Sequence, residues 1–139
     1  MTVEETLEQG NRMMQQFSLT VPTSLVITSN RQTHVWKKKK LKDHCAEIIP
    51  KLAKTIEPVG KATIHVGVTK RTNNRYDPVN LTDTAKPIVD QLVKAGVLDE
   101  DDHRHVFGPW LYHKGIDKKL VDAMRFTVVL TDYTPDTPF

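Results

Sequence analysis

Apolar side chains recur at helical spacing in two segments of the chain. The first segment predicts an amphipathic helix over 38–55, kinked or ended at Pro50, and its apolar positions are Leu41, Cys45, Ile48 and Leu52. The second predicts a helix that begins near residue 83 and stops at Gly96, with apolar positions Ala85, Ile88, Val89 and Leu92. Charged residues separate these positions, so each helix is expected to bury one side.

A two-residue period predicts two strands with one buried face each. The apolar positions are Ile64, Val66 and Val68 in the first strand, and Met124, Phe126, Val128 and Leu130 in the second. Residues 18–30 are rich in β-branched side chains, but Pro22 argues against a central strand and favours an edge. Residues 103–115 resemble a short extended stretch, and 116–123 a loop or helical turn.

The order of these elements favours the α+β class, with a small mixed sheet and two main helices in a single domain. A weak helical pattern from Val3 to Phe17 precedes them. We therefore expect an N-terminal helical arm over 1–20, one folded domain over 21–132 and a loose tail over 133–139.

Composition is compatible with this organisation. The chain has 139 residues, of which 38% are hydrophobic and 27% charged, enough for one domain with its own core. The single cysteine, Cys45, excludes an internal disulfide and a cysteine-based zinc cluster, as expected in a reducing compartment. Acids near the N-terminus and the lack of an apolar run near ~18 residues predict a soluble cytoplasmic protein without a membrane span.

Positive charge is concentrated in two places, although the formal net charge is only +3. Lysines crowd the start of the first helix, where the positive end of the helix dipole disfavours cations and an external anion would relieve the conflict. More cations precede the second helix. The candidate phosphate contacts are Lys37, Lys38, Lys39, Lys40, Lys42, Lys70, Arg71 and Arg75.

Oxygen-bearing side chains flank the second helix. Asp77 and Asn80 precede it, and Asp101 and Asp102 follow it, as in sites where Mg²⁺ takes hard oxygen ligands. A turn role for the first pair and a solvated loop for the second are the plain alternatives. The helix separates the pairs by roughly 18 to 20 Å. Three arrangements remain open. The loop after Gly96 could fold back along the helix, a second copy of the chain could complete the site, or one of the two pairs does not bind metal.

The aromatic residues Trp36, Trp110 and Tyr112 are expected to belong to the core or to cover the sheet, since this is more common than base stacking.

Taken together, "TSNRQTHV", a helix, "KRTNNRYDPVNLTDTAKPIVDQLVKAGVLDEDDHRHV" and "RFTVVLT" resemble the RusA family of Holliday junction resolvases over roughly residues 21–131. The positions similar to the family's motif are Asp77 and Asn80, its helix lysine is Lys86, and its paired aspartates are Asp101 and Asp102. Val79 stands where the family carries a second aspartate.

The resemblance implies a homodimeric, magnesium-dependent endodeoxyribonuclease that nicks four-way DNA junctions in recombination and repair, in the cytoplasm of a bacterial or phage-infected cell. Asp77 with Asp101 or Asp102 would hold Mg²⁺, with Mn²⁺ as a substitute, and Lys86 would neutralise charge on the phosphoryl group. Asn80 would cap the helix and support the site. The position of His103 directly after Asp102 makes it a candidate ligand in place of the missing acid.

Two other functions fit the same residues. The first is a junction-binding protein of the same fold with weakened or lost cleavage, for which Val79 is the best argument. The second is a small protein-interaction domain, which the basic loop beside the acids makes less attractive.

Overall fold

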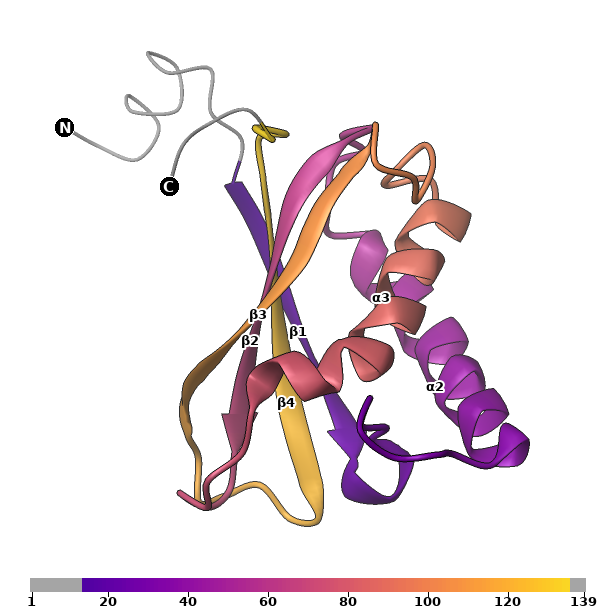
Figure 1. The fold of residues 1–139 in the computed structure, drawn as a ribbon. Coiled ribbons are helices and arrows are strands. Elements are labelled where there is room, and N and C mark those ends of the chain that lie inside the picture. Colours follow the sequence, from indigo (N-terminus) through magenta and orange to yellow (C-terminus); the bar gives the residue numbers. More distant parts are fainter. Residues whose placement is uncertain (1–13, 136–139) are drawn as a thin grey trace, which may run out of the picture.

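A four-stranded mixed sheet with two α-helices on one of its sides forms the structure (Figure 1), a computed structural model that describes residues 14–135. The strands are β1 (Met14–Pro22), β2 (Ala62–Lys70), β3 (Val106–Ile116) and β4 (Ala123–Thr131). The helices are α2 (Val35–Ala53) and α3 (Thr82–Lys94), with short 3₁₀ turns η1 (Thr23–Leu25) and η2 (Pro78–Leu81). The predicted α+β class, mixed sheet and two helices are confirmed.

The strand order is β1-β4-β2-β3, so β2 and β4 are central. β4 pairs antiparallel with both β1 and β2, whereas β3 pairs parallel with β2. In the parallel pair Ala62 lies beside Val106 and Lys70 beside Ile116. Both strands therefore begin at the same end of the sheet, and α3 lies in the connection that returns the chain to that end.

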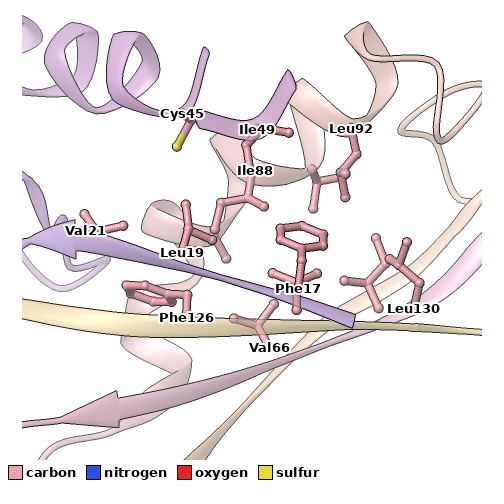
Figure 2. Close-up of a cluster of buried hydrophobic side chains, with 14 of the residues drawn as sticks. Phe17, Leu19, Val21, Cys45, Ile49, Val66, Ile88, Leu92, Phe126 and Leu130 are labelled. Atoms are coloured by element: carbon pink, nitrogen blue, oxygen red, sulfur yellow. The ribbon is translucent and has the colours of Figure 1, made fainter. Parts of the chain in front are cut away.

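The core lies between the helices and one face of the sheet (Figure 2), because alternate side chains of each strand point the same way. The register places Phe17 beside Val128 and Val128 beside Val66, so three strands contribute to one apolar layer. Cys45 of α2 packs against this layer, and burial raises the pKa of its thiol to about 11. The largest fully buried side chains are Phe126, Leu41, Ile49, Ile64, Ile88, Leu92, Leu98 and Leu130.

Helix α2 differs from its prediction at both ends. It begins at Val35 and continues through Pro50 to Ala53, so the proline does not end it. Pro50 lies on the exposed side, and Ile49 rather than Ile48 is the fully buried residue of the last turns.

The predicted N-terminal helical arm over 1–20 is wrong for residues 14–20, which belong to β1. Phe17, Leu19 and Val21 are buried and alternate with exposed Ser18 and Thr20, the period of a strand with one buried face. Pairing with β4 along its whole length outweighs the weak helical pattern. The edge position expected for this segment is confirmed, whereas residues 1–13 lie outside the described residues.

The expected loose tail is also wrong at its start. The Tyr133 hydroxyl donates to the His103 carbonyl at 2.5 Å, and the Thr134 N–H donates to Thr63 Oγ1 at 3.2 Å. Within residues 14–135, no helix has the length and apolar character needed to cross a membrane.

The buried hydroxyl of Thr84 in α3 forms hydrogen bonds with the segment that precedes α2. Thr84 Oγ1 donates to the Ile27 carbonyl at 2.6 Å and accepts from the Ile27 N–H at 2.8 Å. Both residues are almost fully buried, so water cannot replace these bonds. Thr84 therefore positions the chain that leads into α2.

We predict that Thr84→Val destabilises the fold by about 2–3 kcal/mol, because it leaves the buried N–H and carbonyl of Ile27 without partners. Urea unfolding at pH 7 measures the change. Thr82→Val is the matched control, since the Thr82 hydroxyl bonds the Val79 carbonyl at a partly exposed position and should cost less. Equal losses in the two variants would contradict the role given to Thr84.

Candidate nucleic-acid interface

A groove of about 670 Å³ opens where the segment before α2, the first turn of α2 and the loop after β2 meet. Its lining combines a few apolar side chains with mostly polar and basic ones. The lining residues are Val26, Thr28, Asn30, Arg31, Gln32, Thr33, His34, Lys37, Lys70, Arg75, Tyr76, Asp77, Asn80, Leu81 and Met124. Four of these carry a permanent positive charge and one is an acid, so the groove is suited to an anion.

Local hydrogen bonds hold the groove walls together. The N–H and hydroxyl of Ser29 donate to the Asn80 carbonyl at 2.8 and 3.2 Å, which joins the segment before α2 to η2. On the opposite wall, Lys70 Nζ lies 4.1 Å from the centre of the Tyr76 ring and donates to the Asn74 carbonyl at 3.3 Å. These contacts restrain the loop that presents Arg75.

The start of α2 adds a further positive element to the groove. Its N-cap residue, His34, makes no side-chain capping bond, and its first turn contains no acid. The first N–H groups of a helix have no partner within the helix and carry partial positive charge. Since Thr33, His34 and Lys37 line the groove, this helix end supports the attraction of an anion there.

The lysines at the start of α2 do not all lie in the groove, and their contacts differ. Lys37 lines the groove, and Lys38 and Lys42 line a smaller pocket between the helices. Lys39 Nζ lies 3.0 Å from the Asp43 carboxylate, and Lys40 Nζ lies 4.8 Å from the centre of the Trp36 ring. Of the eight predicted phosphate contacts, the groove brings together Lys37, Lys70 and Arg75.

Arg31 and His34 also line the groove, although no pattern in the sequence predicted a role for either. Arg71 is exposed and is not among the lining residues. The available signal for Arg31 and His34 was the segment "TSNRQTHV" itself, which has polar and basic residues directly before a helix start.

Asp77 forms a turn contact, as expected from the alternative that it shapes a turn rather than binding a metal. It is the N-cap of η2, and its Oδ1 accepts the Val79 N–H at 3.1 Å. Its backbone carbonyl accepts the Asn80 N–H at 3.0 Å. Val79 is 61% exposed and adds no ligand atom at this end of the sheet.

Asp101 and Asp102 shortly precede β3, at the end of the sheet where β2 and β3 begin. Asp102 Oδ1 lies 2.6 Å from His105 Nδ1 and accepts the Arg104 N–H at 3.0 Å. The hydrogen bond from His105, followed by that from Arg104, lowers the pKa of Asp102. Asp102 thus stabilises the turn before β3.

Asp101 meets a carboxyl of α3. It lines a pocket with Asp90, Lys42 and Lys94. Burial raises the pKa of Asp90, and the hydrogen bond and negative charge of Asp101 raise it further, against the opposing charges of Lys86 and Lys42.

One chain therefore does not bring Asp77 together with Asp101 in one pocket. Asp77 lies in the groove, whereas Asp101 and Lys86 line two other pockets, which share Lys42, Pro87 and Asp90. In the part of the chain that the structure describes, no three His, Cys, Asp or Glu residues could hold a metal ion together. The donors around Asp77 do not fit a magnesium site formed by one copy.

No protein-family model matches this chain, and no curated protein matches it in sequence.

Asp90 makes stability depend on pH. Its pKa is higher in the folded than in the unfolded chain, so its stabilising contribution is complete below its ordinary pKa of 3.8 and is lost as the pH rises through the folded value. We predict that Asp90→Asn is more stable than the parent chain at pH 7, and that the gain shrinks towards pH 4. Thermal unfolding across this range measures the difference.

The matched control is Asp83→Asn, which removes the same charge from the first turn of α3, where an acid is favourable. This variant should not stabilise the chain at pH 7. A gain for Asp90→Asn that is independent of pH would contradict the assignment to ionisation.

Proposed function

We propose that this chain binds branched DNA, four-way junctions in particular, and holds the phosphate backbone in the groove beside α2. The observation that carries the proposal is the convergence of Arg31, Lys37, Lys70 and Arg75 in one groove, together with an uncapped helix end. Phosphate groups suit both features, because guanidinium groups and helix N-termini bind phosphate oxygens.

This arrangement favours recognition of DNA shape rather than of base sequence. The cations project from three separate segments, so they are suited to contact phosphates of strands that converge at a branch. Contacts of this kind position a protein on DNA and carry no direct sequence information. Affinity should accordingly depend steeply on salt.

The second part of the proposal is metal-dependent nicking by a homodimer of the RusA type. Asp77 lies in the groove, close to where a bound phosphate would lie. Because Asp101 and Asp102 lie at the other end of the same chain, a site that combines them with Asp77 needs a second copy. A two-fold dimer would also relate two equivalent sites, as two symmetric nicks require.

A junction-binding protein without cleavage is the second candidate. It is favoured by exposed Val79 at the position of the family's second aspartate, and by the capping role of the Asp77 carboxylate. Both candidate functions use the groove to bind DNA, and they differ only in whether the bound junction is cleaved.

For the groove, we predict that Lys37→Ala combined with Arg75→Ala weakens junction binding equally for junctions of different sequence. The slope of log affinity against log salt should fall by about two units, one for each lost phosphate contact. Gel shift or fluorescence anisotropy in a salt series without divalent metal measures both quantities.

The control is Lys51→Ala with Lys54→Ala, which removes the same charge at the far end of α2. Its salt slope should match that of the parent chain. Equal slopes for the groove variant and the parent chain would remove the groove from the interface.

For nicking, we predict that Asp77→Asn alone and Asp101→Asn/Asp102→Asn alone are each inactive on a four-way junction with Mg²⁺ or Mn²⁺, and that both still bind it. An equal mixture of the two variants should regain nicking, because a mixed dimer holds one site with Asp77 from one copy and both other acids from its partner. A denaturing gel of end-labelled junction strands measures cleavage.

Several outcomes would count against this shared site. An active Asp77→Asn variant rejects the assignment of Asp77, and a mixture that stays inactive rejects completion by a second copy. If the parent chain never cleaves but Val79→Asp does, the binding-only candidate is correct.

A further inference from the structure

The sheet face turned away from α2 and α3 is the open face, defined by the side chains that alternate with the core residues of each strand. Both helices lie on the other side (Figure 1). Exposed Ser18 and Thr20 of β1 lie on the open face, and the Ser18 hydroxyl is 3.0 Å from that of Thr127 on β4. This part of the face is polar.

Two aromatic rings stand on β3 at the edge of the open face. Trp110 is 46% exposed and Tyr112 is 42% exposed, so of the two expected positions, in the core or covering the sheet, these rings take the second. The register pairs Trp110 with His65 and Tyr112 with Gly67, which places both rings on the open face. Residues two apart on a strand are separated by about 6.6 Å, which leaves room for one base against each ring.

Gly67 lets the Tyr112 ring lie across β2. A Cβ atom at Gly67 would lie 2.8 Å from the Tyr112 hydroxyl and 2.9 Å from its Cζ, closer than atoms of real side chains approach. The ring therefore occupies the space that any other residue at this position would fill. It is held over the sheet by the backbone beneath it, with its outer side accessible.

Cationic and polar groups surround these rings. Lys114 is exposed and lies next to Gly67, and His65 is the partner of Trp110 in the sheet. On the far side of β2, Arg125 lies opposite Thr69 and forms an ion pair with Asp117 at 2.7 Å.

We propose that the open face binds single-stranded DNA, with successive bases stacked on Trp110 and Tyr112 and the backbone held by Lys114 and His65. Aromatic rings on an open sheet face stack unpaired bases of any sequence, and adjacent cations attract the phosphates. A second copy of the chain is a poorer occupant, because the polar side chains of β1 and β4 do not form the apolar centre of a stable subunit interface.

This site is separate from the groove and does not depend on the proposed junction binding. The groove lies at the start of α2, on the helix side of the sheet, and contains neither Trp110 nor Tyr112. The two sites can therefore be tested independently.

The experiment uses the full chain with Trp36→Phe, which leaves Trp110 as the only tryptophan. A fluorescein-labelled oligothymidine of 15 nucleotides measures affinity by anisotropy, and its unlabelled form reports stacking through quenching of Trp110 fluorescence. We expect quenching on binding. In this background Trp110→Ala and Tyr112→Ala should each weaken affinity about 5- to 100-fold, whereas Trp110→Phe should keep most of it.

The variant Lys51→Ala with Lys54→Ala is the control and should retain the oligothymidine affinity within about threefold, because both lysines lie at the far end of α2 and belong to neither proposed site. Thermal unfolding of each variant separates loss of binding from loss of fold. Unchanged affinity in the Trp110→Ala and Tyr112→Ala variants, or absence of quenching, would overturn the proposal. If light scattering showed that Trp110→Ala turns a dimer into a monomer, the face would be a subunit interface and the proposal would also be rejected.

Discussion

The parallel pairing of β2 with β3 is the constraint on which the arrangement of charge in this protein depends. Two parallel strands start at the same end of a sheet, so the chain must return along the sheet between them. Here the return contains α3, thirteen residues and about 20 Å long, beside a β2 strand of about 30 Å. Whatever precedes α3 therefore lies at the opposite end of the sheet from whatever follows it.

This separation divides the polar chemistry of the chain in two. At the end where β2 finishes, the groove collects Arg31, Lys37, Lys70 and Arg75 around a single carboxylate. At the other end, Asp90 and Asp101 line one pocket with Lys42. A net charge of only +3 thus conceals one strongly basic region, and local charge rather than net charge governs how a polyanion approaches.

Placement of both helices on one side of the sheet has a second consequence. One face of β1 and β4 joins the core, whereas the other carries polar side chains and, on β3, two exposed aromatic rings. The exposed positions of this second face lie on the edge strands β1 and β3, whereas Thr63, Thr69 and Thr127 of the central strands are buried. The molecule therefore presents two chemically different surfaces, a basic groove and a sheet face with aromatic rings.

Local periodicity was sufficient to predict α3, β2, β4 and the alternation of their buried residues, because burial of one side imposes a repeat that the sequence carries directly. That repeat did not predict that Lys37, Lys70 and Arg75 come together in one groove. It depends on Thr84 and Asn80 joining the segment before α2 to the start of α3. Likewise, Phe17, Leu19 and Val21 form a strand because β4 pairs with them.

The residues of the candidate site were visible in the sequence, but their grouping was not. Asp77, Asp101 and Asp102 stand out as acids beside a helix, and spacing alone could not exclude a fold-back or a shared site. Pairing between strands far apart in sequence sets the direction of β2 and β3, and this pairing keeps Asp77 apart from Asp101 within one chain. The exposure of Trp110 and Tyr112 was decided in the same way, since both helices pack on the opposite face of the sheet.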